Sequence, residues 1–355
     1  MIVVIDASVA FKLVEGFRYP GHSVLRMHGT PHRTGVELQG ALLAAAGRLG
    51  IDIVASATAT DLYAASDGRV VAVRFSRPDG SAETVGCEAL VLACCGFGGD
   101  KEMLRREIPE IADAEFSGHT GNRGDAAKWG RALGAALADM ASYQGHGAVA
   151  VPYGNPVNWG VLMSGGYQVN SRGERFSNEV RGYSEQAVEV IAQPGRVAWN
   201  VYDEERERLI LGFADYEEIR SLDGIRKAHG PRELAATLGI PADVLERTNA
   251  EVDALRASGA PDRWGRSFGG SAPLAPPFCA VKVTGALFHT QGGLVIDTSA
   301  RVLRPDRTPL PNLFAGGGAA RGLSGPSNWG YFSGSGLLTA TTLGRIAGTN
   351  AARLR

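Results

Sequence analysis

The sequence predicts an α/β fold in which short apolar strands alternate with glycine turns and helices. Three observations lead to this class. Glycine is common, with 48 residues among 355, and it concentrates in turns that follow apolar strands. The segment 84–93 ends in a uniformly apolar run, which is typical of a central parallel strand. Near the C-terminus, short strands at 294–297 and 313–315 precede a glycine turn and an apolar helical run at 337–347.

Composition excludes several classes of function. A chain of this length predicts two domains and a sizeable core. The formal net charge of −1 gives no indication of a nucleic-acid partner. The longest apolar stretches are too short for a membrane span, and no signal peptide is recognisable. The four cysteines show no CxxC pair and no disulfide spacing, which predicts reduced thiols and a cytoplasmic protein.

The N-terminal half is predicted to contain a helix and several strands. The helix covers 34–50 and ends in glycine. Strands are predicted at 51–57, 70–76 and 84–93. Asp-Gly pairs at 67–68 and 79–80 predict hairpin turns between them.

The middle of the chain, from about 149 to 280, is more charged and more helical. A hairpin with two short strands is predicted at 166–179. Helices are predicted at 203–209, 231–239 and 241–255, the second with proline in its first turn. No internal repeat and no long linker separates this part from its neighbours.

The segments 289–297 and 310–348 carry the densest glycine. A strand, a glycine turn and a helix N-terminus together form a site for a polar or anionic cofactor group. The alternative is a tight connection that binds no ligand.

This C-terminal part resembles the flavin-binding segment of the fumarate reductase and succinate dehydrogenase flavoprotein family, which includes the 3-ketosteroid dehydrogenases. The similarity runs from about residue 19 to the end, with motifs in order at 120–137, 166–179 and 262–266. The resemblance implies a Rossmann-like FAD-binding domain with an inserted α+β capping domain. The implied boundaries are 1–148, 149–280 and 281–355. FAD is the implied cofactor, and a small apolar ketone and an electron acceptor are the implied partners.

The resemblance also implies which residues contact FAD. They lie at the strand end near 94, at the helix start near 125 and in the last glycine turn. The implied set is Ala93, Cys94, Gly96, Asp125, Gly316, Gly317, Ser333, Gly334, Gly336 and Leu337. Asp125 is expected to be the N-cap of its helix. We expect 286–348 to complete the flavin domain, with His289 beside the turn at 95–96.

The start of the chain departs from the family. The strand predicted at 2–5 runs into Asp6, and the GxGxxG that normally holds the pyrophosphate does not follow. We therefore expect a chain whose first βαβ unit is missing and which binds FAD weakly. The opening also resembles the first strand of a PIN-type nuclease, an alternative that rests on the first dozen residues alone.

Two tyrosines stand where the fumarate-reducing members hold arginines. In those members one arginine, the proton donor, follows the glutamate of Arg-Phe-x-Asn-Glu by four residues. Another arginine, at the start of the final glycine turn, binds a carboxylate of the substrate. The corresponding residues here are Tyr183 and Tyr331. Because the 3-ketosteroid dehydrogenases use tyrosines in these neighbourhoods, the resemblance implies catalytic roles for both and a neutral cyclic ketone as substrate. The alternative is that each ring only packs near the flavin.

Two histidines favour the other branch of the family. His146 and His289 stand where the fumarate-reducing members hold substrate-binding histidines, so both are candidate catalytic residues. Each histidine has the alternative role of fixing the backbone near the flavin. Gly318 replaces an acidic residue that bonds the cofactor in many relatives, which weakens the expected FAD affinity.

Three other histidines invite a metal hypothesis. His28 and His32 are four residues apart, but Pro31 between them prevents a common helical face. With His22, they are predicted to belong to a loop near the substrate entrance, and no metal site is expected. For the whole chain, the alternatives to ketone dehydrogenation are a fumarate or enoate reductase and a non-catalytic remnant that binds no FAD.

Overall fold

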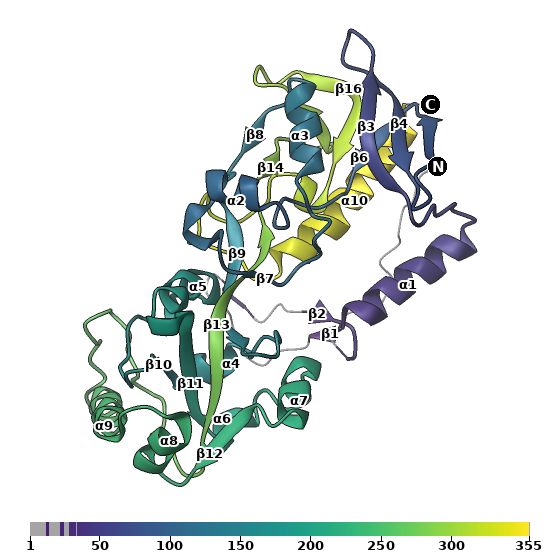
Figure 1. The fold of residues 1–355 in the computed structure, drawn as a ribbon. Coiled ribbons are helices and arrows are strands. Elements are labelled where there is room, and N and C mark those ends of the chain that lie inside the picture. Colours follow the sequence, from purple (N-terminus) through teal and green to yellow (C-terminus); the bar gives the residue numbers. More distant parts are fainter. Residues whose placement is uncertain (1–11, 14–21, 25–27, 33, 355) are drawn as a thin grey trace.

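The computed structural model describes residues 12–13, 22–24, 28–32 and 34–354. Two groups of elements lie at either end of one long strand, β13 (Phe278–Thr290) (Figure 1). The strand predicted at 2–5, together with Asp6, lies outside the described residues.

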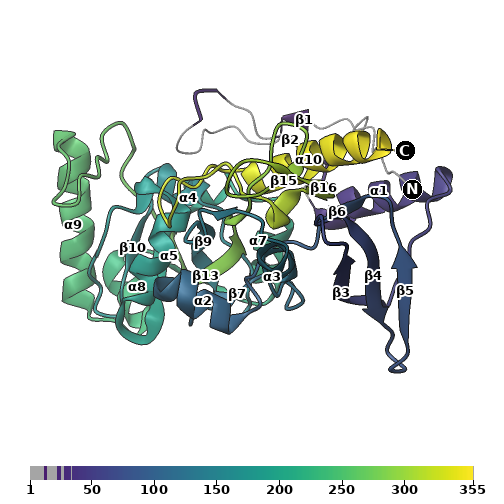
Figure 2. The ribbon, with the colours of Figure 1, turned by 90° about the horizontal axis from the view of Figure 1, so that it is seen from above.

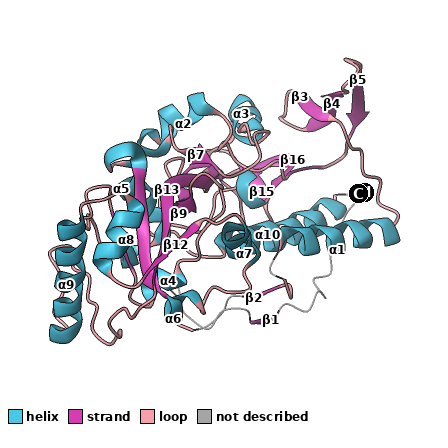
Figure 3. Ribbon diagram, turned by 60° about the horizontal axis from the view of Figure 1, so that its bottom comes forward, coloured by secondary structure: helices cyan, strands magenta, loops and turns pink. Residues whose placement is uncertain are grey.

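One sheet is built around β13. Its strands are β10 (Tyr167–Val169), β11 (Val197–Asp203) and β12 (Ile225–Ala228), in the order β10-β11-β13-β12. Nearer its C-terminal end, β13 pairs with β9 (Tyr143–Ala150) antiparallel and with β7 (Glu115–Phe116) parallel. The helices gathered around this sheet are α4 (Gly160–Met163), α5 (Tyr183–Ile191), α6 (Glu204–Glu207), α7 (Ala214–Ser221), α8 (Pro231–Leu238) and α9 (Ala242–Ser258) (Figure 3).

The second group of elements surrounds a three-stranded sheet in the order β15-β16-β6. These strands are β15 (Arg301–Leu303), β16 (Pro309–Ala315) and β6 (Leu90–Leu92), with β6 parallel to β16. A smaller pair is formed by β14 (Gly293–Leu294) and β8 (Leu137–Ala138). The helices here are α2 (Lys101–Glu107), α3 (Asp125–Ala132) and α10 (Ser335–Ala352).

The remaining elements lie outside these two groups. A sheet of β3 (Thr58–Ala64), β4 (Val70–Ser76) and β5 (Ala82–Gly86) lies at the opposite end of the molecule from α9 (Figure 2). α1 (Gly35–Arg48) precedes it, and the two-residue strands β1 (Lys12–Leu13) and β2 (His28–Gly29) pair with each other. Short 3-10 helices are η1 (Pro109–Ile111), η2 (Glu179–Arg181), η3 (Pro194–Arg196) and η4 (Gly317–Ala319).

The α/β class is confirmed, and so are several individual elements. α1 begins where predicted because the Thr34 side chain accepts from the Glu37 N–H over 3.3 Å. α8 starts with Pro231 and ends at Gly239, whose φ of 69° suits glycine. β4 matches its predicted bounds, and α9 and α10 contain the predicted helical runs at 241–255 and 337–347 almost entirely.

The strand predicted at 51–57 is wrong. The strand that pairs with β4 is β3, at 58–64. The turn between them is closed by the Ala65 N–H, which donates to the Arg69 carbonyl over 2.8 Å. Because this hairpin fixes the register, the strand must end next to the Asp-Gly turn, at Ala64, and not seven residues earlier, at 57.

The single strand predicted at 84–93 is also wrong, because the segment contributes to two sheets. β5 pairs with β4, whereas β6 pairs with β16 and lies at the edge of its described sheet. The buried Asn312 side chain holds the crossing point, donating to the Glu88 carbonyl over 2.8 Å and to the Val70 carbonyl over 2.7 Å. The predicted parallel pairing is therefore confirmed only for 90–92.

The predicted hairpin at 166–179 contains one strand instead of two. β10 pairs with β11, and the Asn170 N–H donates to the Glu174 carbonyl over 3.0 Å to close the turn. The following residues belong to no strand, because the Arg175 side chain is drawn into a buried ionic cluster described below. The sequence analysis did not predict β13, and the proposed boundary between residues 280 and 281 falls inside it. The domain division stays a prediction.

Candidate active site

Glycine brings the turn after β6 into direct contact with the end of β13. A Cβ atom at Gly96 would overlap the Thr290 Oγ1, and one at Gly318 would lie 3.0 Å from the Gly96 nitrogen. The Phe97 N–H donates to Thr290 Oγ1 over 3.1 Å. His289, the residue before Thr290, therefore lies beside this turn, as the motif order predicted. A residue with a larger side chain at position 318 would clash with the turn.

The first turn of α10 offers uncapped backbone donors. Gly334 is the N-cap, with a φ of 83°, and no side chain caps the helix. The Leu337 and Leu338 side chains beside this turn are exposed. A flat ring system with polar edges fits such a surface, because apolar side chains meet its faces while N–H groups meet its acceptors. Gly334, Gly336 and Leu337 are thus placed where a flavin ring would be held.

The expected role of Asp125 as an N-cap is wrong. Asp125 is the first residue of α3, and Gly124 is the N-cap with a φ of 73° and no side-chain cap. A Cβ atom at Gly124 would lie 2.6 Å from the Met103 Sδ and 2.8 Å from the Phe97 Cβ. Only glycine fits this turn, and for that reason the cap falls one residue before the aspartate.

The other predicted cofactor residues fall into two groups. Ala93 and Cys94, at the end of β6, are exposed, and the Ala126 N–H of α3 lies beside the Cys94 thiol. Gly316 and Gly317 instead let the end of β16 approach α10, since a Cβ at Gly316 would lie 3.2 Å from the Gly344 nitrogen. The exposed strand end and the uncapped starts of α3 and α10 together fit a bound FAD.

The four predicted catalytic side chains form one continuous row of ring contacts. The ring centroids of His146 and Tyr183 are 5.1 Å apart, and those of Tyr183 and Tyr331 are 5.7 Å apart. His289 follows at 5.9 Å from Tyr331. The four residues come from β9, α5, the loop before α10 and β13, so only the tertiary fold brings them together.

Burial keeps three of these groups neutral near pH 7. It raises the pKa of Tyr331 to about 12, against the opposing effect of hydrogen bonds to Ser335 and Tyr183. Burial lowers the pKa of His146 to about 4, and it also lowers the pKa of His289. Tyr331 is therefore a protonated phenol, and both imidazoles are uncharged.

The tautomer of each histidine follows from its hydrogen bonds. The Ala148 N–H donates to His146 Nδ1 over 3.2 Å, and the Gln291 amide nitrogen donates to His289 Nδ1 over 3.2 Å. In each neutral ring the proton must then be on Nε2. Both histidines are consequently hydrogen-bond donors through Nε2.

Ser333 links Tyr183 to the loop before α10. Its Oγ lies 2.9 Å from the Tyr183 hydroxyl oxygen, and its side chain is buried. The predicted cofactor residue Ser333 therefore has its hydroxyl hydrogen-bonded to a predicted catalytic residue. The His22 Nε2 donates to the Ser333 carbonyl over 3.1 Å, and its ring lies 4.7 Å from that of Phe332. His22 thus fixes this loop, a role that the sequence did not indicate.

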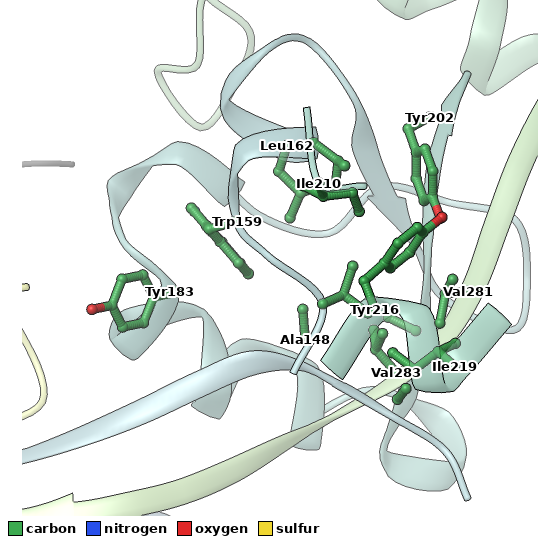
Figure 4. Packing of buried hydrophobic residues seen from close by; sticks show 14 of the residues in the cluster. Ala148, Trp159, Leu162, Tyr183, Tyr202, Ile210, Tyr216, Ile219, Val281 and Val283 are labelled. Carbon is green, nitrogen blue, oxygen red and sulfur yellow. The ribbon is translucent and has the colours of Figure 1, made fainter. Parts of the chain in front are cut away.

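A cavity of about 210 Å³ opens beside Tyr183. Aromatic rings form most of its wall, and none of its described lining residues is an arginine or a lysine. Figure 4 shows Trp159 and Tyr183 at one side of the buried cluster, with the Tyr183 hydroxyl directed away from the other labelled side chains. The lining residues are Gln144, His146, Pro156, Asn158, Trp159, Tyr183, Phe213, Asp215 and Phe288.

Buried charges lie just before Tyr183 in the chain, and they pair with one another. Glu179 contacts both Arg175 and Arg266 at 2.8 Å, and Arg175 contacts Asp262 at 2.8 Å. Burial by itself raises the pKa of Glu179, but the two arginines lower it to about 2. This cluster joins β10 to the loop at 262–266 and fixes the turn that leads to Tyr183.

The sequence analysis missed the residues that complete the site. Thr290, Trp159, Phe288 and Asp215 reach it only through the fold, and only Phe288 and Thr290, as the neighbours of His289, carried a local signal. In the described part of the chain, no three His, Cys, Asp or Glu side chains converge as metal ligands. None of the described helices combines the length and apolarity that crossing a bilayer requires.

Comparisons with known proteins agree with this geometry. A family model described as FAD binding domain matches residues 11–335. A probable fumarate reductase of Shewanella frigidimarina is 28% identical over 95% of this chain and 56% of its own length. The chain spans about half the length of the curated relatives it matches.

Two solved structures are similar to the whole described fold. The open conformation of a flavocytochrome c3 fumarate reductase matches with a TM-score of 0.77 and 27% identity, over 98% of this chain and 61% of that one. A 3-ketosteroid Δ4-(5α)-dehydrogenase from Rhodococcus jostii, in complex with 4-androstene-3,17-dione, matches with a TM-score of 0.66 and 25% identity. That match covers 91% of this chain and 65% of the enzyme. The predicted family, fold class and cofactor are thereby confirmed.

Proposed function

The chain belongs to the FAD binding domain family, and on that premise we propose that it dehydrogenates a cyclic ketone at the α and β carbons. Bound FAD supplies the hydride acceptor for such a reaction. The observation that carries the proposal is the aromatic cavity beside Tyr183, whose described lining residues include one carboxylate, Asp215, and no arginine or lysine. A neutral ring with one ketone matches such a cavity better than a dicarboxylate does.

The residues around Gly336 can polarise the ketone. The Tyr331 phenol stays protonated because burial raises its pKa to about 12. The His289 Nε2 lies close to Gly336, since a Cβ there would be 3.1 Å away from it. With the uncapped N–H groups of α10, these donors stabilise negative charge that develops on a carbonyl oxygen.

Tyr183 is the group we assign to the α-carbon proton. Its hydroxyl lies 2.9 Å from Ser333 Oγ, so a proton can pass between the two oxygens. Because Ser333 is buried and its backbone is held by His22, this pair keeps a fixed geometry. In its ionised form Tyr183 takes the α-carbon proton and becomes a phenol, which can pass a proton on to its hydrogen-bond partner Ser333, while Tyr331 and His289 hold the oxygen.

The residues that would hold FAD lie around these donors. The exposed residues Ala93 and Cys94, the turn that follows them and the starts of α3 and α10 would surround its ring and polar edges. The other partner in this proposal is an electron acceptor. The proposed compartment is the cytoplasm, because all four cysteines are free thiols.

A fumarate or enoate reductase is the second candidate. It is supported by the probable fumarate reductase among the relatives and by the neutral Nε2–H donors of His146 and His289. Against it stands the replacement of two arginines by Tyr183 and Tyr331. Losing charge-assisted pairs typically costs a few kcal/mol, or roughly two to three orders of magnitude in affinity.

The two candidates are distinguished by one comparison. The FAD-supplemented chain is assayed with a cyclic 3-keto steroid and with fumarate, using the same artificial electron carrier in its oxidised or reduced form. We expect faster turnover of the ketone. Faster turnover of fumarate would contradict the proposal and assign substrate binding to His146 and His289.

A further inference from the structure

The cavity has opposite polarity at its two ends. At its inner end, His146 is buried and carries its proton on Nε2, for which the described residues provide no hydrogen-bond partner. At its outer end lies Asp215, which is exposed in the first turn of α7. A donor thus faces the cavity from inside and a carboxylate faces it from the mouth.

The carboxylate at the mouth is not neutralised. Asp215 Oδ1 accepts from the Asn155 amide over 3.4 Å, and the same amide donates to Glu218 Oε2 over 2.9 Å. Two carboxylates therefore share one neutral donor. Within the described residues, neither Asp215 nor Glu218 forms an ion pair, although the neighbouring Glu217 pairs with Arg220. The mouth keeps an excess of negative charge and of acceptor oxygens.

The helix that carries Asp215 is firmly anchored. The hydroxyl oxygen of the next residue, Tyr216, lies 2.7 Å from that of Tyr202, and it donates to Glu207 Oε1 over 2.8 Å. Figure 4 shows the hydroxyl groups of Tyr216 and Tyr202 pointing toward one another. Tyr216 and Tyr202 are fully buried. Because α7 is fixed in this way, Asp215 keeps its position relative to the aromatic wall, as a specificity-determining group requires.

We infer that Asp215 selects substrates that carry a hydrogen-bond donor or a cation at the end remote from the ketone, and disfavours substrates with an anion there. This inference rests on the proposed function, since it places the ketone oxygen at Tyr331 and His289 and the remote end of the substrate towards Asp215. The substrate class is then a cyclic ketone with a hydroxyl or ammonium group across the ring or on a following ring. A keto acid with its carboxylate at that end would meet Asp215 and the nearby Glu218 at the mouth.

Three ketones that differ in one group test this inference. They are 4-aminocyclohexanone, 4-hydroxycyclohexanone and 4-oxocyclohexanecarboxylate, titrated calorimetrically into the FAD-supplemented chain, with turnover measured in parallel. We expect affinity to fall in that order. In Asp215→Asn, the preference for the ammonium over the carboxylate compound should shrink by about three- to tenfold, and in Asp215→Lys it should reverse.

A matched control separates this local effect from the overall charge. Asp223→Asn removes the same charge beyond the other end of α7, where the Asp223 side chain is 95% exposed and does not line the cavity. It should leave all three affinities unchanged. The inference is overturned if the carboxylate compound binds the parent as tightly as the ammonium compound, if none of the three binds, or if both asparagine variants shift affinities alike. Binding in the expected order without turnover would support Asp215 as the selective group and would refute the proposed dehydrogenation.

Discussion

Two regions on either side of the start of α5 differ sharply in how they handle charge. Before the helix, Glu179 is buried with Arg175 and Arg266 in an ionic cluster. Four residues later, Tyr183 enters a row of aromatic rings that ends at His289. The same short turn therefore separates a buried ionic cluster from the aromatic part of the cavity wall.

The difference shows that buried charge in this protein has a structural role. Arg175 and Arg266 already contact carboxylates, and releasing either one would leave an unpaired charge in the interior. They are not available to a carboxylate substrate. The described lining of the cavity offers no cation, and its donors near Tyr183 are a phenol and an imidazole, which suit a neutral oxygen.

The largest expected effect comes from breaking the ionic cluster. Glu179→Gln should lower the free energy of unfolding by about 3–5 kcal/mol, because it leaves two buried arginines without their shared partner. Chemical denaturation measures this change. The control is Glu174→Gln, which breaks the exposed pair with Arg172 at 3.0 Å and should cost less than about 1 kcal/mol. Equal losses in both variants would contradict the comparison.

The free energy of unfolding should depend on pH through the same ionic cluster. The folded-state pKa of Glu179 is about 2, below its ordinary value of 4.5, so its contribution is present above pH 4.5. That contribution should be lost as the pH falls from about 4.5 towards 2. In Glu179→Gln, this part of the acid-induced loss of stability should be absent.

Removing the Tyr183 hydroxyl tests the function of the row of aromatic rings. Tyr183→Phe should lower turnover of a cyclic ketone roughly a hundredfold or more, because the proton-transfer group is lost while the ring remains. The flavin absorbance and the unfolding transition should stay close to those of the parent. The matched control is Tyr153→Phe, whose hydroxyl only donates to the Leu222 carbonyl over 3.1 Å outside the cavity lining. A Tyr183→Phe variant as active as the parent would exclude the assigned role.

His146 gives a second test of the row of aromatic rings, because burial disfavours the charged form of its imidazole. Its folded-state pKa of about 4 lies below the ordinary 6.5, so the unfolded chain binds more protons between these values. Stability should therefore rise with pH from about 4 to 6.5, by at most about 3 kcal/mol. His146→Gln should flatten this rise in pH-dependent denaturation, whereas substituting the exposed His229 by Gln should not. An unchanged slope in His146→Gln would indicate that the imidazole is charged.

The smallest effect is expected from two glycines of the same helix. In Gly336→Ala the new Cβ would lie 3.1 Å from His289 Nε2, so the imidazole must shift and ketone turnover should fall several-fold. In Gly344→Ala the new Cβ has no atom within 4 Å, and up to about 1 kcal/mol of stability should be gained without a change in turnover. A loss of turnover in both variants would show that turnover depends on substitutions anywhere along α10, and not on the contact between its first turn and His289.

Local chemistry was enough to predict several elements. Thr34 and Gly239 mark helix ends through hydrogen bonding and backbone conformation, which depend on neighbouring residues. The Asp-Gly turns were predicted correctly for the same reason. The strands around them were placed less well, because a strand pairs with partners that its own sequence does not specify. The branch of 82–92 into two sheets depends on Asn312, more than two hundred residues away.

The sequence by itself determined the family, the cofactor and the four candidate catalytic residues, because these depend on motifs whose order is written in the chain. Only the tertiary structure decided how those residues are arranged, and their catalytic roles stay a prediction. The pairing of Tyr183 with Ser333, the protonated Tyr331 and the neutral His146 follow from burial and from contacts between distant segments. Burial and long-range contacts are properties of the folded chain, and no local pattern of residues encodes them.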